Sequence, residues 1–200
     1  MDDTTKYIHD SIKRWVWSGF YSPSEVDSMI DDVLEEGADE GFLRGSVAPE
    51  FIAKQEAERG WPACTDCDRL DQAFRALDSI GVLALQNAGY TMSDGHSDAA
   101  EALAEKGRKS YFGYCFYHGQ DLERAVDGGG LTIAFNQLEG DVPDKHKVGA
   151  TVVAELERAG FKCDWNGDVN IRISIAEFDW KKRGKGAPES LVKKPWWKYF

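Results

Sequence analysis

Metal-ligating side chains occur at alternate positions in one short polar stretch of the sequence, at Asp94, His96 and Asp98. If this stretch is extended, residues two apart point the same way and the three side chains can converge on a divalent ion. His118 and Asp121, at the end of a predicted strand, could complete the coordination shell. Carboxylate and imidazole ligands suit Zn²⁺, Mn²⁺ or Fe²⁺, and an open coordination position would activate water. One hypothesis is therefore a divalent metal cofactor in a metal-dependent hydrolase.

The same residues also have ordinary structural roles, and the spacing leaves both interpretations open. Asp98 is a natural helix cap, Asp94 begins a turn with the glycine that follows it, and His96 fits a solvated loop. His118 and Asp121 lie at a predicted strand-to-helix junction, where α/β proteins often place functional groups. They are the catalytic candidates, although a histidine at a strand end is more often a cap. No nucleophile is linked to them by spacing, and no established metal-site spacing is met.

Two further motifs are weaker indications of a functional site. Cys64 and Cys67 form a C-x-x-C motif, but Asp66 between them disfavours a thiolate, and Cys67 lies on an apolar helix face. The three glycines at 128–130 follow a predicted helix and precede a strand, whereas a phosphate-binding loop runs from strand to helix. Both a redox centre and a phosphate loop are therefore disfavoured.

Acidic residues dominate the charge of the chain. Its 200 residues include 35 Asp and Glu against 24 Lys and Arg, a net charge of −11. Residues 1–175 carry −15, whereas residues 176–200 carry +4. Because a protein that coats nucleic acid must neutralise phosphates with Lys and Arg, we expect no nucleic-acid partner. The acidic body favours a basic protein partner, with a surface that serves only solubility as the simpler alternative.

The C-terminal tail, residues 181–200, combines basic residues with Trp196, Trp197 and Tyr199. Adjacent tryptophans left in water would mark a contact surface, so these three aromatic residues are the predicted partner-binding residues. Within the tail, residues 184–188 form a hinge-like stretch, and the aromatic segment 190–200 that follows could pack on the acidic body of its own chain, on a sister subunit or on another partner. Packing on a sister subunit would make the protein a homo-oligomer.

Helical patterns occupy the first sixty residues. Apolar residues recur at helical spacing between residues 8 and 16. Ser22 and Glu25 have the spacing of a capping box, which predicts the start of a second helix. Pro49 is expected to open a third helix that reaches about Gly60, because proline fits the first position of a helix.

From residue 61 onward, predicted helices alternate with predicted strands. Strands are expected at Val82–Gln86, Tyr111–His118 and Leu131–Leu138, where apolar and aromatic residues are concentrated. The stretch 87–97 is expected to be an irregular polar loop. Further helices are predicted from about Thr65, at Asp98–Lys106, at Asp121–Asp127 and at Lys145–Ala159.

A final hairpin is predicted around Asn166 and Gly167. A two-residue turn would place apolar residues opposite polar ones. A three-residue loop instead pairs Trp165 with Val169 and keeps one side of the hairpin apolar. We therefore expect the three-residue loop, with a bulge.

Together these patterns predict an α+β fold. It has a mixed, mostly antiparallel sheet of about five strands, flanking helices and an N-terminal helical segment. We expect three regions: a helical segment at 1–60 packed on the body, an α+β domain at 61–180, and the basic aromatic tail at 181–200.

The sequence contains no recognisable targeting or membrane segment. The N-terminus lacks a basic region followed by an apolar one, and no apolar run approaches 18 residues. Four cysteines are too few for a disulfide scaffold in a chain of this length. We expect a soluble cytoplasmic protein with no membrane partner.

Five motifs in the middle of the chain are distinctive: Trp61–Pro62, Thr65–Asp71, Asn87–Thr91, Ser93–Gly95 and Gly113–Asp121. They resemble an uncharacterised family of bacterial proteins, known only as a domain of unknown function. The likeness runs from about residue 5 to residue 183. The resemblance implies a bacterial cytoplasmic setting and one continuous architecture, but no activity, cofactor or catalytic residue.

The leading hypothesis from the sequence is a partner-binding protein of unknown activity. In its concrete form it is immunity- or antitoxin-like and masks a basic partner by electrostatic complementarity. The acidic body, the basic aromatic tail and the lack of a connected catalytic set favour this reading over an enzyme. The alternative remains a metal-dependent hydrolase with a site near Asp94, His96, Asp98 and His118.

Overall fold

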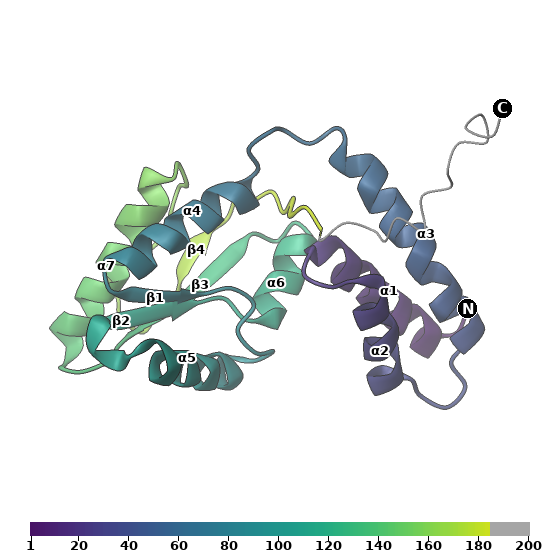
Figure 1. Ribbon diagram of the computed structural model, residues 1–200, viewed down its shortest axis with the longest axis horizontal. Helices are drawn as coiled ribbons and strands as arrows, with labels where there is room; N and C mark the ends of the chain where they lie inside the picture. Colours follow the sequence, from purple (N-terminus) through teal and green to yellow (C-terminus); the bar gives the residue numbers. More distant parts are fainter. Residues whose placement is uncertain (185–200) are drawn as a thin grey trace. The chain divides into compact units, whose positions relative to one another are not determined.

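The computed structural model describes residues 1–184 and divides the chain into two compact units (Figure 1). Unit 1 comprises Met1–Ala63 and the described part of Lys181–Phe200, and unit 2 comprises Cys64–Trp180. Unit 2 is therefore a single continuous segment, whereas unit 1 is built from two separate segments of the chain.

Unit 1 is a group of three helices, α1 (Asp3–Ser18), α2 (Pro23–Val33) and α3 (Glu40–Glu58). Each helix contributes one apolar face to a shared core, because an amphipathic helix is stable only when that face is covered. The core residues are Ile8, Ile12, Val16, Val26, Ile30, Leu43, Val47 and Phe51.

The helix starts in unit 1 follow local capping rules, with one correction. The predicted capping box of α2 is confirmed, because Ser22 and Glu25 each satisfy the other's backbone N–H. The prediction that Pro49 opens a helix is wrong. Helix α3 begins at Glu40, where the Asp39 side chain accepts from the Phe42 N–H at 2.9 Å, and Pro49 lies inside it. Tertiary packing of the α3 core face outweighs the local cost of a proline within a helix.

The described end of the chain returns to α3. The Gly184 N–H donates to Glu58 Oε1 at 3.0 Å, and the same oxygen pairs with the buried Lys54 Nζ at 2.8 Å. Arg183 donates to the carbonyl oxygen of Pro62 at 2.6 Å. These contacts attach residues 181–184 to unit 1.

Unit 2 contains a four-stranded sheet in the order β1 (Val82–Leu85), β2 (Gly113–Phe116), β3 (Leu131–Gln137) and β4 (Ile173–Ile175). Strands β1 and β2 are parallel, and the other two pairings are antiparallel. The predicted α+β class and mixed sheet are confirmed. The prediction of about five, mostly antiparallel strands is wrong, because four strands form the sheet within the described part of the chain.

The missing strand is the first arm of the predicted hairpin. Instead of pairing Trp165 with Val169, the chain makes one isolated bridge between Asp164 and Ser174. The Trp165 indole N–H turns inward to the backbone carbonyls of Asp168 and Ile171, at 3.0 and 3.2 Å. The loop thus closes around Trp165. The second arm of the predicted hairpin forms β4, which pairs with β3.

Helices cover both faces of the sheet (Figure 1). Helices α4 (Asp66–Ser79) and α7 (Val142–Arg158) lie on one face, and α5 (Met92–Lys106) lies on the other. The alternation of β2 explains this arrangement. Gly113 faces α7, where a Cβ would meet Val148 at 2.3 Å, and Phe116 faces α5. The short η1 (Arg108–Ser110) precedes β2, and α6 (Gly119–Val126) follows it.

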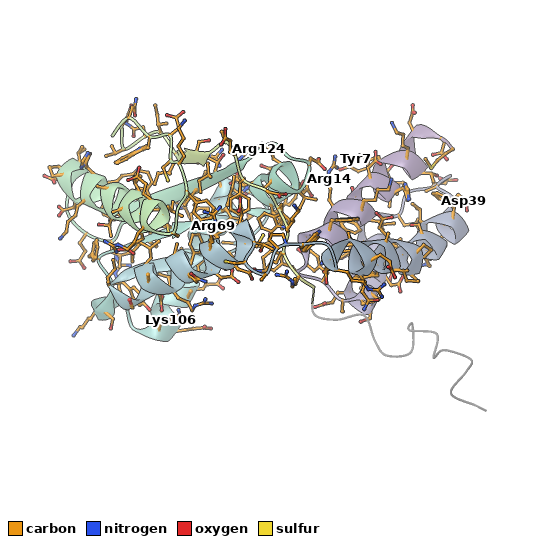
Figure 2. All side chains as sticks on the ribbon, turned by 90° about the horizontal axis from the view of Figure 1, so that it is seen from above. Tyr7, Arg14, Asp39, Arg69, Lys106 and Arg124 are labelled. Carbon is orange, nitrogen blue, oxygen red and sulfur yellow. The ribbon has the colours of Figure 1, made fainter. Side chains whose placement is uncertain are left out.

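Helices α4 and α7 are joined by Arg69, which reaches the end of α7 (Figure 2). Its guanidinium donates to the carbonyl oxygens of Ala159 and Gly160 at 3.2 and 3.0 Å, and it lies 4.5 Å from the ring centroid of Phe161. A cation at this position satisfies carbonyls that have no partner within the helix. Asp66, at the start of α4, pairs with the same arginine at 2.6 Å.

Among residues 1–184, no helix is long and apolar enough to cross a membrane.

Candidate functional site

The candidate catalytic pair lies where the chain passes from β2 into α6, as the sequence predicts. His118 is the N-cap of α6, and its Nδ1 accepts from the backbone N–H of Asp121 at 3.3 Å. In return, Asp121 Oδ2 accepts from the His118 N–H at 3.5 Å. The two side chains therefore form a capping box in which histidine replaces the usual serine or threonine.

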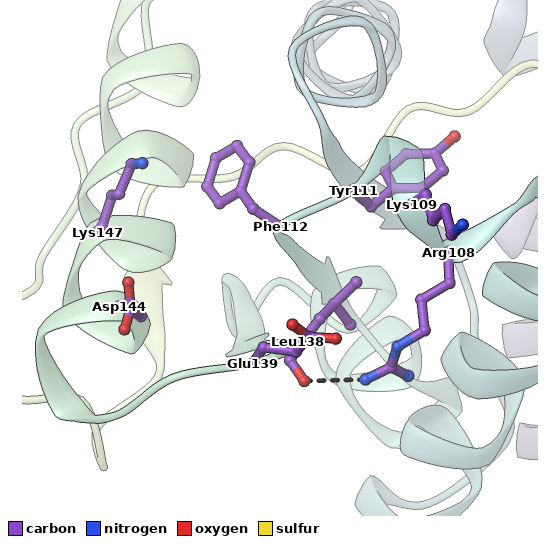
Figure 3. A pocket seen from close by; sticks show the side chains of 8 residues that line it. All are labelled: Arg108, Lys109, Tyr111, Phe112, Leu138, Glu139, Asp144 and Lys147. Atoms are coloured by element: carbon purple, nitrogen blue, oxygen red, sulfur yellow. Dashed lines mark hydrogen bonds between the residues drawn. The ribbon is translucent and has the colours of Figure 1, made fainter.

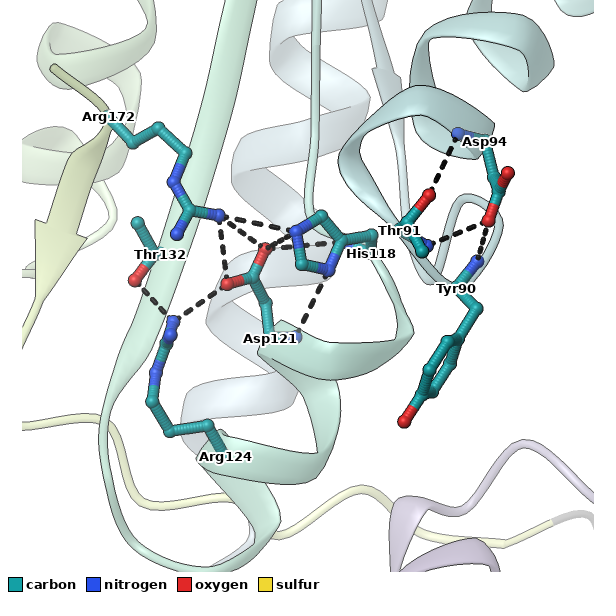
Figure 4. Close-up of polar contacts among 8 residues, drawn as sticks. All are labelled: Tyr90, Thr91, Asp94, His118, Asp121, Arg124, Thr132 and Arg172. Atoms are coloured by element: carbon teal, nitrogen blue, oxygen red, sulfur yellow. Dashed lines mark hydrogen bonds and ion pairs between the residues drawn. The ribbon is translucent and has the colours of Figure 1, made fainter.

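Asp121 is the buried centre of a cluster of charged side chains (Figure 4). It is fully buried, and both of its carboxylate oxygens accept from Arg172, at 3.0 and 2.9 Å. Arg124 donates to Asp121 Oδ1 at 2.8 Å and also to the hydroxyl of Thr132 on β3. His118 Nε2 lies 3.2 Å from Asp121 Oδ2. A buried carboxylate needs this number of donors because burial removes its hydration.

These contacts assign the tautomer of His118. Because Nδ1 accepts a backbone N–H, the proton lies on Nε2, which donates to Asp121. Arg172 also approaches Nε2 at 3.4 Å, but its bonds to the carboxylate are shorter. Burial lowers the pKa of His118, Asp121 opposes this shift, and Arg172 and Arg124 add to it. His118 is thus a neutral imidazole with both nitrogens engaged, and proton transfer would require the cap to open.

The metal-ligand candidates lie on a helix and not in an extended loop. The prediction of a loop at 87–97 is wrong from Met92 onward, where α5 begins. Thr91 caps this helix and Asp94 completes its capping box, with Asp94 Oδ2 accepting from the Thr91 N–H at 2.9 Å. These hydrogen bonds to Thr91 lower the pKa of Asp94. The start of α5 is therefore at Thr91, and the prediction that Asp98 caps it is wrong.

The helix directs His96 away from Asp94 and Asp98, because residues two apart differ by about 200° around a helix. His96 turns to the sheet, where its Nδ1 lies 2.9 Å from the Tyr114 hydroxyl and its ring meets Phe116 edge-on at 5.1 Å. Burial lowers the pKa of His96. Asp98 is exposed on the second turn of α5.

The structure brings His118 together with Asp121 but does not group the four predicted metal ligands. Within residues 1–184, no three His, Cys, Asp or Glu side chains are arranged to hold a metal ion. The geometry therefore gives no support to a metal-dependent hydrolase built on Asp94, His96, Asp98 and His118.

Two glycines explain why the distinctive motifs surround this region. A Cβ at Gly95 would lie 2.2 Å from the ring of Phe116, so only glycine lets α5 pack this closely on β2. A Cβ at Gly119 would lie 2.7 Å from the ring of Tyr90. The Gly119 N–H also donates to the Gly89 carbonyl oxygen at 2.9 Å, joining the loops that follow β1 and β2. Close packing and helix capping thus account for these motif residues.

Sequence reasoning missed both arginines of the cluster. Arg172 is 51 positions from Asp121, and Arg124 is one turn along α6 from it. The available signal was Arg172 itself, a charged residue between Ile171 and Ile173 in a predicted strand. In an alternating strand such a residue is also typical of a position that faces solvent, so the sequence does not identify a partner for it.

The two cysteines of the C-x-x-C motif lie in different surroundings. Cys67 is buried on α4, whereas Cys64 is exposed before the helix. Burial raises the pKa of Cys115, and burial together with Glu157 raises the pKa of Cys163 to about 11. A raised pKa keeps a thiol protonated and unreactive.

The predicted partner-binding residues Trp196, Trp197 and Tyr199 lie outside the described residues, so their role remains a prediction.

Residues 1–184 match the family described as a domain of unknown function, DUF6891, so the chain belongs to this family. The match includes all five distinctive motifs and confirms the resemblance to a family of unknown function. No curated protein and no solved structure matches the chain.

Proposed function

We propose that the protein is a binding module for a basic protein partner, and that the acidic surface of unit 1 makes the contact. The observation that carries the proposal is the charge around α2. Between residues 25 and 40 the chain has eight acidic residues and no basic one. Asp31, Asp32, Glu35 and Glu36 in this stretch are all exposed.

An exposed aromatic residue lies beside this acidic surface. Phe42 on α3 is 44% exposed and packs against the ring of His9 on α1 at 5.1 Å. Arg44, two residues further along α3, pairs with Asp31 and with Glu40. An aromatic side chain next to charged residues is the usual composition of a binding hot spot and its rim.

The state of the His118–Asp121 pair also favours binding over catalysis. Its carboxylate is neutralised by two arginines, and both ring nitrogens of the histidine are engaged in the folded protein. A partner whose basic surface matches the charge of α2 would be attracted over distances of about one Debye length, roughly 8–10 Å at physiological salt. This is the behaviour expected of an immunity- or antitoxin-like protein.

The test is capture of partners on the immobilised full-length protein, followed by titration of each purified candidate at two salt concentrations. The test variant neutralises three exposed acids on and directly after α2: Asp32→Asn, Glu35→Gln and Glu36→Gln. The matched control neutralises three exposed acids on α5: Asp98→Asn, Glu101→Gln and Glu105→Gln.

We expect a basic protein whose affinity falls about tenfold or more in the α2 variant and is nearly unchanged in the α5 control. Its affinity for the wild-type protein should also fall as salt rises. Equal weakening in both variants would show that only net charge matters and would reject the α2 surface. Failure to find a salt-sensitive basic partner would contradict the proposal as a whole.

A further inference from the structure

A hollow of about 660 Å³ opens in unit 2, at the opposite end of β2 from His118 (Figure 3). It lies between η1 and the first turns of α7, and Phe112 and Leu138 line it with apolar surface. This volume is within the range of small-molecule sites, which is about 300–1,000 Å³.

Three cationic side chains surround this hollow: Arg108, Lys109 and Lys147. Their concentration is unexpected because residues 64–180 contain 20 acidic and only 11 basic side chains. Arg108 is held in place by a hydrogen bond from Nη2 to the carbonyl oxygen of Leu138 at 2.9 Å. The side chain of Lys109 makes no ion pair or hydrogen bond with any residue in 1–184, so its ammonium group is available to a ligand.

The aromatic residues give the hollow a second recognition element. Lys147 Nζ lies 4.9 Å from the ring centroid of Phe112, so this ring already accepts a cation on its face. Tyr111 lies on the opposite side of the hollow from Lys147 and donates its hydroxyl hydrogen to Asp78 at 3.0 Å. A planar ring of a ligand could pack against Phe112 and Leu138 while its anionic group contacts the basic side chains.

Two carboxylates also line the hollow and limit what can bind. Asp144 is engaged in the capping box of α7, where its Oδ2 accepts from the Asp141 N–H at 3.1 Å. Glu139 is exposed and can accept hydrogen bonds from ligand hydroxyl or amino groups. A bare, highly charged anion is therefore a poorer fit than an organic anion with a ring.

We propose that this hollow is a binding site for a small organic anion that carries a planar ring, such as a nucleoside monophosphate or an aromatic carboxylate. The ring contacts Phe112 and Leu138, and the anionic group contacts Lys109, Lys147 and Arg108. The site lies within unit 2 and uses no residue of the acidic surface of unit 1, so its occupancy can be measured without a protein partner.

The experiment follows the amide signals of Phe112 and Leu138 by NMR while the full-length protein is titrated with four probes. Adenosine monophosphate and benzoate carry both a ring and an anionic group. Adenosine and inorganic phosphate each lack one of these. The comparison of adenosine monophosphate with benzoate separates a phosphate source from a carboxylate source.

We expect saturable shifts with adenosine monophosphate or benzoate, at an affinity at least fivefold higher than with adenosine or phosphate. Lys109→Gln and Lys147→Gln should each weaken binding about fivefold, since each removes one charge-assisted contact. Lys162→Gln, an exposed lysine elsewhere in unit 2, should leave the affinity unchanged. Well-dispersed amide signals in each variant will show that it is folded.

Three results would overturn the proposal. The first is the absence of saturable shifts with both adenosine monophosphate and benzoate at millimolar concentration. The second is binding of inorganic phosphate or adenosine as tight as that of the combined probes, which would remove either the ring or the charge from the recognition. The third is equal binding to the wild-type protein and to both lysine variants.

Discussion

Replacing Asp121 by asparagine removes a buried charge while nearly preserving the shape of the side chain. Only 1% of the Asp121 side chain is exposed, and it accepts from two guanidinium groups. Removing one partner of a buried ion pair costs about 3–5 kcal/mol, because the remaining charge is left without compensation. The Arg172 and Arg124 side chains are 34% and 40% exposed, so water can partly hydrate them once the carboxylate is gone. We therefore expect the lower end, about 3 kcal/mol of lost unfolding free energy.

Hydrogen exchange of the slowest amides in β2 and β3 measures this loss within unit 2, whatever the stability of unit 1. Asp98→Asn on the exposed face of α5 makes the same chemical change and should cost less than about 0.5 kcal/mol. A loss below about 1 kcal/mol for Asp121→Asn would refute the reasoning. Adding Arg172→Gln tests the mechanism further, because its effect should be smaller in the Asp121→Asn background than in the wild-type protein. Strictly additive effects would show that the two residues are not coupled.

Three further predictions concern pH, packing and thiol reactivity. Folding lowers the pKa of His118 below its ordinary 6.5. The contribution of His118 to the unfolding free energy is therefore complete above pH 6.5 and is lost as the pH falls through the lowered pKa. The difference between the unfolding free energies at pH 7 and pH 5, measured with urea, should be smaller in His118→Asn than in the wild-type protein. Gly95→Ala should destabilise unit 2 by about 1–3 kcal/mol, because the new methyl group meets the ring of Phe116. The control Gly45→Ala on α3 has open space around the new methyl group and should be neutral or stabilising. Thermal unfolding measures both variants. At pH 8 a thiol reagent should react with the folded protein in one fast phase, which Cys64→Ser abolishes, and the buried thiols should react after unfolding. A fast phase that persists in Cys64→Ser would reject the assignment of this phase to Cys64.

The sequence was most informative where a structural rule is local. The capping box of Ser22 and Glu25 depends on residues three apart, and the structure has it as predicted. The strands β1, β2 and β3 were also found, because each is a short apolar run between turn-forming residues.

The start of α5 was missed because Gly95 and its polar neighbours have low helix propensity. The helix forms there because Gly95 allows contact with Phe116, a residue 21 positions further along the chain. The proline within α3 was misread because core packing of Leu43, Val47 and Phe51 outweighs the local cost of a proline inside the helix. Both helices nevertheless start at local caps that the sequence analysis overlooked, Asp39 for α3 and the Thr91–Asp94 capping box for α5.

The candidate site was predicted in part. His118 and Asp121 were selected because of their position after a strand, and the structure joins them directly. The error lay in the expected direction of Asp94, His96 and Asp98, which followed from an extended backbone that the chain does not adopt. Arg124 has the local i,i+3 spacing to Asp121 and was overlooked, whereas the pairing with Arg172 could not be predicted because a spacing of 51 residues follows no local rule.

The division of the chain into a continuous unit and an interrupted one affects the order in which the protein can be completed during synthesis. Residues 64–180 emerge from the ribosome as one block, and the Asp179 N–H closes on Asp66 Oδ2 at 3.0 Å, which joins the two ends of that block. The contacts of residues 181–184 with Glu58 and Pro62 form only after this block has been translated. The N-terminal helices are thus made first but receive their last contacts at the end, and a chain that ends shortly before residue 181 would contain all of unit 2 but lack these contacts of unit 1.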